Sequence, residues 1–357
     1  MKVLIGLSGG VDSTVSAMLL KDAGHDVTGI TMKIWKDGKY KGGTKDACLS
    51  PTEKDDVIRI KELCKSLGIV HYDFDCSDEY EKIVIENFRQ EYLSGNTPNP
   101  CVRCNSFLKF GVLPNLARKS GLEFDKFATG HYARIGQNEA GRYTLSVAAD
   151  KTKDQSYFLY RLNQQQLGML LLPLGNLTKA EVRDYARKAH LAVSDKPDSQ
   201  DFYSGDHNEL LETPDLEGNI VDLSGKVLGK HKGFWHYTIG QRRGLGIGAG
   251  SPLYVVELNA CRNEVVVGSA ADTIRSKIKI NSCNWVSIEE PGEPLNVEVK
   301  VRSASKPTPA MLKPIGDGTF ELEFQDGVSA AAAGQSAVVY SGDLLLGGGI
   351  ISIPGKN

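Results

Sequence analysis

The pattern of hydrophobic and polar positions divides the chain into two parts of different character. Up to about residue 204, short β-rich apolar runs alternate with segments of helical periodicity, which predicts parallel strands joined by crossover helices. The expected strands cover 3–7, 27–34, 70–75 and 126–129, and the clearest helices cover 52–67 and 78–93. The first part therefore has the pattern of an open α/β domain.

Beyond about residue 206 the chain is built from short strands separated by glycines, with turns expected at 217–219 and 223–226. From about residue 278 onward, apolar and charged residues alternate with a period of two, as in 297–302, which predicts a small antiparallel β-barrel. The fold class is thus α/β: a parallel-sheet domain, a small central β-rich domain and a C-terminal barrel. The predicted domains are 1–205, 206–275 and 276–357.

Composition and charge limit the cellular location of the protein but do not identify its binding partner. The chain has 357 residues, seven cysteines and a net charge of −2. It has no long apolar run and no apolar leader, so neither a membrane span nor secretion is expected. We therefore expect a cytoplasmic location. An odd number of irregularly spaced cysteines also suits a reducing compartment. A nucleic acid would have to be bound by local basic patches.

A glycine-rich loop follows the first predicted strand directly and precedes a helix-forming run. Its residues are Gly6, Leu7, Ser8, Gly9, Gly10, Val11, Asp12 and Ser13. Adjacent glycines and a helix N-terminus together form an anion site, and the pyrophosphate of ATP fits such a site. The spacing matches neither a Walker loop nor a dinucleotide fingerprint.

A second motif places two cysteines three residues apart, at Cys101 and Cys104, after two prolines. We expect a helix to begin near Asn105 or Ser106, with Cys104 at its positive end, where the pKa of a thiol falls. Lys109 would add to the effect, so Cys104 is the candidate nucleophile. A structural cysteine and half of a zinc site are the alternatives, but the chain has no second Cys-x-x-Cys, and no metal site is expected.

These motifs resemble those of a known family. Ser-Gly-Gly-x-Asp-Ser resembles the PP-loop of ATP pyrophosphatases, and with Asn-Pro-x-x-x-Cys-Asn it resembles the tRNA-specific 2-thiouridylases. Further similar blocks cover 128–134, 153–159, 237–246 and 334–337. The resemblance implies ATP-dependent 2-thiolation of the wobble uridine in the anticodon loop of tRNA. ATP and Mg²⁺ are the implied cofactors, and a persulfide donor, such as a cysteine desulfurase or sulfur relay protein, is the implied partner.

The same resemblance implies roles for individual residues. Gly6 to Ser13, Met32 and Gly130 would line the ATP site, with Asp12 a partner of Mg²⁺. Cys104 would carry the sulfur, and Asn99, Pro100 and Cys101 would face the target base. The implied tRNA contacts are His131, Lys153, Asp154, Gln155, Arg302, Ser303 and Gln335.

The segment 230–243 combines basic residues with aromatic ones. Such interleaving is typical of surfaces that bind single-stranded RNA, and we predict RNA contact there. The alternative is a solvated basic turn whose aromatic side chains belong to the core of the second domain.

The chain departs from the family at two positions that matter for the sulfur step. Tyr203 stands where better-known members have a second cysteine, in the block that begins at Asp198, and Cys101 stands where they have an aspartate. Three hypotheses follow. Cys101 could resolve or carry the persulfide; Cys101 and Cys104 could hold an iron–sulfur cluster with Cys48 or Cys76; or the chemistry could be impaired or altered.

Two rival functions remain open on the sequence alone. One is another PP-loop enzyme that adenylates its substrate, such as an amidating enzyme or a tRNA-modifying ligase, which would need no nucleophilic cysteine. The other is a tRNA-binding paralogue without sulfur transfer, which the change at Tyr203 motivates.

Overall fold

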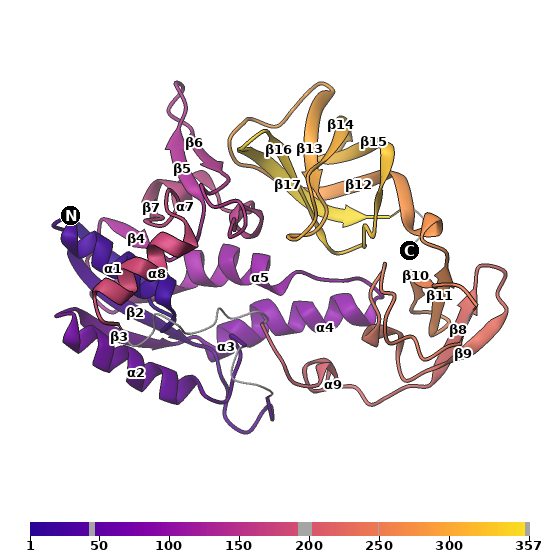
Figure 1. Ribbon diagram of the computed structural model, residues 1–357, viewed down its shortest axis with the longest axis horizontal. Coiled ribbons are helices and arrows are strands. Elements are labelled where there is room, and N and C mark those ends of the chain that lie inside the picture. The colour runs from indigo at the N-terminus through magenta and orange to yellow at the C-terminus, as the bar shows by residue number, and fades with distance from the viewer. Residues whose placement is uncertain (43–46, 192–201, 249, 354–357) are drawn as a thin grey trace.

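The computed structural model describes residues 1–42, 47–191, 202–248 and 250–353 (Figure 1). Its N-terminal part is built around a parallel sheet of order β3-β2-β1-β4-β7. The strands are β1 (Lys2–Gly6), β2 (Asp26–Lys33), β3 (Val70–Asp75), β4 (Lys126–Ala128) and β7 (Leu170–Leu171). The first four coincide with the predicted runs to within a residue or two, so the parallel α/β prediction is confirmed.

Helices cover this sheet because their apolar positions recur on one face. They are α1 (Val11–Asp22), α2 (Glu53–Ser66), α6 (Leu113–Lys119), α7 (Gln164–Met169) and α8 (Lys179–Lys188). The predicted helix 78–93 runs as α3 (Ser77–Tyr80), η1 (Glu81–Ile85) and α4 (Glu86–Leu93), with a π-helical turn in its middle. Its predicted inner face is correct, since Tyr80, Val84 and Phe88 are buried.

The cysteine motif lies on a helix that begins earlier than expected. It comprises α5 (Pro100–Arg103) and η2 (Cys104–Val112) and continues into α6. Asn99 is the N-cap, its side chain accepting a hydrogen bond from the backbone N–H of Val102, and Pro100 occupies the first turn. Both are ordinary helix-start signals. The predicted start near Asn105 or Ser106 is therefore wrong.

The central part contains a sheet of order β10-β11-β8-β9. Its elements are α9 (His207–Leu211), β8 (Gly218–Asp222), β9 (Val227–His231), η4 (Phe234–His236), β10 (Tyr254–Asn259), β11 (Glu264–Gly268) and η5 (Ala271–Thr273). The turn expected at 223–226 is confirmed, with the Gly225 N–H donating to the Asp222 carbonyl. The turn expected at 217–219 is wrong, because Gly218 and Asn219 already pair with β9 as part of β8.

The C-terminal part is an antiparallel barrel, as predicted. Its strands are β12 (Ile274–Trp285), β13 (Leu295–Lys300), β14 (Thr308–Gly316), β15 (Thr319–Ser329), β16 (Ser336–Ser341) and β17 (Leu344–Ser352). Pairing of β12 with β17 closes it. Val297, Val299 and Val301 point into its core, as their alternation indicates.

A hairpin from the first part of the chain extends the sheet of this barrel. Strands β5 (Arg134–Gln137) and β6 (Tyr143–Ser146) pair with each other, and Leu344 of β17 pairs with Ser146. The hairpin stands beside the barrel in Figure 1. The short helix η3 (Ser156–Leu159) follows it. In the described part of the chain, no helix is long and apolar enough to span a membrane.

Candidate nucleotide and sulfur-transfer site

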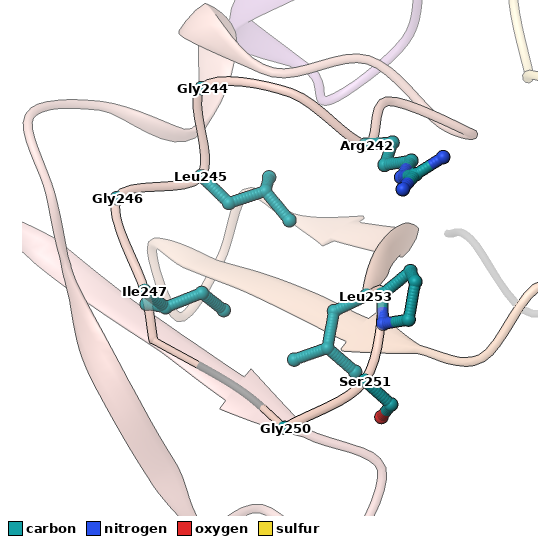
Figure 2. Close-up of a pocket in the computed structure, with 9 residues that line it drawn as sticks. Arg242, Gly244, Leu245, Gly246, Ile247, Gly250, Ser251 and Leu253 are labelled. Carbon is teal, nitrogen blue, oxygen red and sulfur yellow. The ribbon is translucent and has the colours of Figure 1, made fainter.

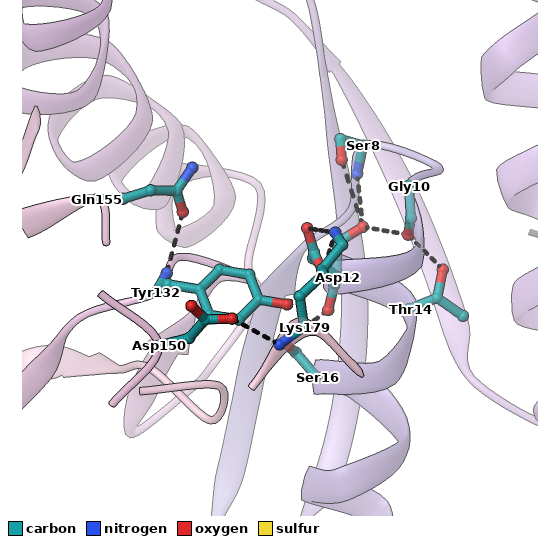
Figure 3. Close-up of polar contacts among 10 residues, drawn as sticks. Ser8, Gly10, Asp12, Thr14, Ser16, Tyr132, Asp150, Gln155 and Lys179 are labelled. Atoms are coloured by element: carbon teal, nitrogen blue, oxygen red, sulfur yellow. Dashed lines mark hydrogen bonds and ion pairs between the residues drawn. The ribbon is translucent and has the colours of Figure 1, made fainter. Parts of the chain in front are cut away.

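The glycine loop connects β1 to α1 without any side chain capping the helix. Gly10 is the N-cap and Gly9 has a φ of +72°, a left-handed conformation that favours glycine. Ser13 Oγ donates to the Gly10 carbonyl at 3.2 Å and accepts from the Ser8 N–H at 3.3 Å (Figure 3). The first N–H groups of α1 have no partner within the helix, so the loop offers donors and a positive dipole end to a phosphate.

Gly130 comes close to this loop from the end of β4. A Cβ atom at residue 130 would lie 2.7 Å from the Ser13 nitrogen and 2.8 Å from the Asp12 carbonyl carbon. Only glycine fits, so the segment after β4 forms one wall of the loop. Leu7 and Val11 are buried, and Met32 on β2 packs partly buried against the core. The sequence expectation that these residues line an ATP site remains a prediction.

Lys179 is a residue of this site that the sequence reasoning did not assign. Its Nζ lies 2.8 and 2.7 Å from the two carboxylate oxygens of Asp12, and Tyr132 Oη donates to the same carboxylate at 2.7 Å (Figure 3). The Lys179 side chain is only 8% exposed. Thr178 and Glu181 form a capping box that begins α8 here. That capping box is a local signal for the start of α8, but not for the contact of Lys179 with Asp12.

The Cys104 thiol is in a different environment from the expected one. Because α5 begins at Pro100, Cys104 lies a full turn into the helix and not at its positive end. Burial raises the pKa of Cys104 to about 11, and the positive charge of Lys109 only partly opposes this. The predicted lowering of the pKa is therefore wrong. Cys101, in the first turn, is partly exposed.

The cysteine helix packs against the segment that follows β4, with the ring centroids of Phe110 and His131 5.6 Å apart. The charge of Lys109 lowers the pKa of Cys104 and also that of His131, whose pKa burial holds well below the usual range. A neutral His131 ring hydrogen-bonds Thr129 Oγ1 at 2.8 Å. His131 directly follows Gly130, so the thiol and the loop share one neighbourhood.

The residues do not fit an iron–sulfur cluster. The charge of an ionised Cys48 contributes to the raised pKa of Cys104, and that of an ionised Cys104 contributes to the raised pKa of Cys76. Even so, no three His, Cys, Asp or Glu side chains converge as a metal site within residues 1–42, 47–191, 202–248 and 250–353. No step of the reaction is derived through a cluster.

The turn that carries Lys153, Asp154 and Gln155 reaches the nucleotide loop through Tyr132. Asp154 accepts from the Ala148 N–H at 3.1 Å, and Gln155 Oε1 accepts from the Tyr132 N–H at 3.0 Å. Gln155 therefore positions Tyr132, which in turn contacts Asp12 in the loop. The implied tRNA contacts of the three residues remain predictions.

The barrel contacts the loop that leads into the cysteine helix. The Thr97 N–H donates to the Ala333 carbonyl at 2.8 Å, and Gln335 Nε2 donates to the Pro98 carbonyl at 3.3 Å. Farther along the barrel, Arg302 Nη2 donates to the Ile239 carbonyl at 2.7 Å, and Ser303 is exposed. Gln335 therefore contacts the chain just before Asn99. The implied tRNA contacts of Arg302, Ser303 and Gln335 remain predictions.

Tyr203 is a buried structural residue. It is 3% exposed, its hydroxyl donates to the Glu209 carboxylate, and its ring packs edge-on against Tyr40. The preceding block, Asp198 to Asp201, lies outside the described residues. A persulfide has no place at this hydroxyl, so the second sulfur function of the family must lie elsewhere or be missing.

The aromatic side chains of segment 230–243 do not form a stacking surface. Phe234 and Trp235 are each 4% exposed, and the Trp235 indole donates to Asn208. These aromatic side chains belong to the core, as the alternative stated, and RNA contact by the basic residues of the segment remains a prediction. Arg242 stays exposed at the rim of a pocket of about 470 Å³ (Figure 2). Its walls are Gly244, Leu245, Gly246, Ile247, Gly250, Ser251, Pro252 and Leu253.

Comparison with family models agrees with the three-part fold. Residues 1–203 match the model described as tRNA methyl transferase HUP domain, residues 210–269 the tRNA methyl transferase PRC-barrel domain, and residues 275–351 the aminomethyltransferase beta-barrel domain. The fold and the glycine loop thus define a multidomain α/β enzyme with a HUP-type nucleotide-binding domain.

Individual relatives give the particular family. The tRNA-specific 2-thiouridylase MnmA of Endomicrobium trichonymphae is 49% identical over 98% of this chain and 99% of its own length. The proteins of that name from Gloeothece citriformis and Clostridioides difficile are 46% and 41% identical, each over 98% of this chain and over 99% and 98% of their own lengths. The chain belongs to the tRNA-specific 2-thiouridylase family.

Proposed function

We propose that this chain is an ATP-dependent tRNA sulfurtransferase that converts the wobble uridine of tRNA to 2-thiouridine. Its relatives at 49% and 46% identity are named for that activity and match over nearly their whole length. The observation that carries the proposal is the packing of Phe110, on the cysteine helix, against His131, with ring centroids 5.6 Å apart, because the adjacent Gly130 lies directly against the glycine loop. An ATP-activating loop and a thiol within one neighbourhood are what thiolation of a carbonyl carbon requires.

In the first step, the C2 oxygen of the uridine attacks the α-phosphate of ATP, and pyrophosphate leaves. The free N–H groups of α1 and the Lys179 ammonium are the donors that would hold the departing charge. Mg²⁺, when bound with the nucleotide, neutralises phosphate charge and usually takes one or two carboxylates. Asp12, whose side chain is 27% exposed, fits that role.

In the second step, a terminal persulfide sulfur on Cys104 attacks C2, and AMP leaves with the former C2 oxygen. The RNA is then held to Cys104 through an S–S bond. The Cys101 thiolate attacks the Cys104 sulfur, releases 2-thiouridine and leaves a Cys101–Cys104 disulfide, which an external thiol reduces. The two cysteines lie one helical turn apart, on α5 and at the start of η2.

A persulfide-carrying protein, such as a cysteine desulfurase or a relay protein, would reload Cys104. The seven cysteines, all of them among the described residues, are thiols and not disulfides, which suits the reducing conditions of the cytoplasm. Asn99 is the N-cap of α5, at the start of the helix that carries both cysteines. It is proposed to face the target base together with Pro100 and Cys101.

Mass spectrometry of tRNA nucleosides tests the proposal. Unmodified tRNA is incubated with ATP, a low-molecular-weight persulfide and a thiol, and with the wild type, Cys104→Ala, Cys101→Ala or Cys261→Ala. We expect 2-thiouridine from the wild type and from the Cys261 control, whose thiol is exposed and lies in the β-rich half. Cys104→Ala should lose turnover. When the thiol is left out, the wild type should release one equivalent of 2-thiouridine, whereas Cys101→Ala should retain the RNA on Cys104.

The outcome separates the rival functions. If Cys104→Ala still consumes ATP and modifies tRNA, the reaction is amidation or another adenylation that needs no thiol. A protein that binds tRNA but releases no pyrophosphate would be a non-catalytic paralogue.

A further inference from the structure

Phe107 is an exposed aromatic residue on the cysteine helix, and its ring lies near the guanidinium groups of two arginines. It is 42% exposed and stands about one helical turn after Cys104. The Arg103 guanidinium lies 5.3 Å from the ring centroid and the Arg161 guanidinium 5.7 Å from it. Arg103 immediately precedes Cys104, so this cluster borders the thiol.

Within the described residues, no carboxylate pairs with either arginine, although Arg103 Nε donates a hydrogen bond to the Ile83 carbonyl. The pKa of Arg103 is lowered, first by burial and then by the nearby Arg161 charge. Glu91 attracts Arg103 from a distance, but its Oε2 already accepts from Asn96 at 2.8 Å. Two adjacent cations of this kind are stabilised by an external anion.

The ring itself has no role in the core. Most of the large aromatic side chains are buried, including Phe234 and Trp235, which the sequence suggested for RNA stacking. Phe107, by contrast, is 42% exposed and has two planar, positively charged groups near its ring. This combination of a π-face with phosphate-binding guanidiniums is typical of single-stranded RNA sites.

We propose that Phe107 is a stacking subsite for a nucleotide adjacent to the target uridine, with Arg103 and Arg161 binding the phosphates of that nucleotide. The inference rests on the proposed function, because the nucleotide belongs to the same tRNA. Stacking a neighbouring base on Phe107 would help hold the target uridine out of the anticodon stack, next to Cys104. An acidic protein surface would use the two cations but would gain little from the ring.

Fluorescence of 2-aminopurine tests the stacking directly. The probe is an unmodified tRNA transcript with 2-aminopurine on the 5′ or the 3′ side of the target uridine, and the protein is the full chain. We expect quenching on one side with the wild type and with Phe107→Tyr. Phe107→Leu should lose the quenching and bind at least about tenfold more weakly, because stacking on an aromatic residue contributes substantially per base.

The phosphate contact is tested by salt dependence. Arg161→Gln should reduce the slope of log K against log salt by about one, which is the effect of losing one phosphate contact. Phe124→Leu is the matched control, since Arg118 lies 4.5 Å from the Phe124 ring in a similar cation–π pair elsewhere on the protein. This control should bind tRNA like the wild type, and all variants should bind ATP normally.

The remaining outcomes would contradict either the stacking subsite at Phe107 or the proposed sulfurtransferase function. Wild-type affinity and quenching in both Phe107→Leu and Arg161→Gln would overturn the stacking subsite while 2-thiouridine formation still upheld the function. A wild type that neither binds nor thiolates tRNA would remove the proposed function instead. Normal tRNA binding, with loss of sulfur transfer only from a protein donor, would make the cluster a protein-docking surface and overturn the RNA assignment.

Discussion

Lys179 and Asp12 form an ion pair within the glycine loop although they lie 167 positions apart in the chain. A Walker loop carries its phosphate-binding lysine immediately after its glycines, and this loop has none. Here the ammonium group beside the loop is that of Lys179, the first residue of α8. Asp12 holds that ammonium beside the free N–H groups of α1, where a polyphosphate would compete with the carboxylate for it.

Lys179→Met should therefore impair both ATP binding and stability. It leaves the Asp12 carboxylate without its cation and near the phosphates, so ATP affinity should fall at least tenfold. Breaking a mostly buried pair should cost about 2–3 kcal/mol, less than for a fully buried one, because the Asp12 side chain is 27% exposed. Calorimetric ATP titration and urea unfolding measure the two effects.

Lys188→Met serves as the control for this substitution, because Lys188 is exposed at the other end of the same helix. It should change neither quantity. Undiminished ATP affinity in Lys179→Met would show that the ammonium serves only to hold α8 against the loop.

Gly130→Ala should block the nucleotide site sterically. The added methyl group would lie 2.7 Å from the Ser13 nitrogen, in the first turn of α1. Overpacking of this kind typically costs about 1–3 kcal/mol, and here the strain falls on the loop that would bind phosphate. Gly292→Ala, where the methyl group would meet nothing within 4 Å, is the control. Equal ATP affinity for the two variants would contradict this placement of Gly130.

The reaction of Cys104 with an alkylating reagent should increase with pH well beyond neutrality. Since its pKa is raised to about 11, the thiolate fraction should grow about tenfold per pH unit up to that value. Lys109→Met should slow alkylation further, because the Lys109 charge lowers that pKa. Peptide mass spectrometry separates Cys104 from the exposed Cys48 and Cys261.

The same shift has a consequence for stability. Burial disfavours the thiolate, so the folded-state pKa lies above that of the unfolded chain. The stabilisation from the neutral Cys104 thiol is then complete below the ordinary thiol pKa and is lost as pH rises through about 11. Alkylation of Cys104 that is already maximal at neutral pH would contradict the buried environment.

The sequence predicted local elements well and long-range contacts poorly. The strand, glycine turn and helix around Ser8 to Ser13 follow from neighbouring residues, and so does the alternation of Val297 to Val301. The start of the cysteine helix was misjudged although Asn99 and Pro100 are cap signals. The pair between Lys179 and Asp12 has no local signature, and neither has the pairing of Ser146 with Leu344. The domain limits 1–205, 206–275 and 276–357 remain predictions.

Tyr203→Phe should leave thiolation unchanged. The Tyr203 hydroxyl donates to Glu209, whose carboxylate also accepts from the Lys41 N–H at 3.1 Å. Losing one hydrogen bond to a charged group should lower the free energy of unfolding by about 1–2 kcal/mol. Nucleoside mass spectrometry and urea unfolding give the two readouts. A loss of 2-thiouridine at unchanged stability would assign the hydroxyl a chemical role.

Gly334→Ala should separate tRNA modification from ATP binding. Gly334 has a φ of +86°, and a Cβ there would lie 2.9 Å from Asn96 Cβ and 3.1 Å from the Thr97 nitrogen. The barrel would be pushed away from the loop that leads to Asn99, while the nucleotide loop stays untouched. We expect 2-thiouridine formation to fall about tenfold at unchanged ATP affinity.

Gly342→Ala is the matched control for this last substitution. It imposes a methyl group on another left-handed glycine of the barrel, with a φ of +58°, but nothing lies within 4 Å of it. Both variants should lose about 1 kcal/mol of stability from the backbone strain. Only Gly334→Ala should lose thiolation, because only there does the strain reach Thr97 and the start of the cysteine helix. Equal loss in both would mean that the barrel affects the reaction through its stability and not through this contact.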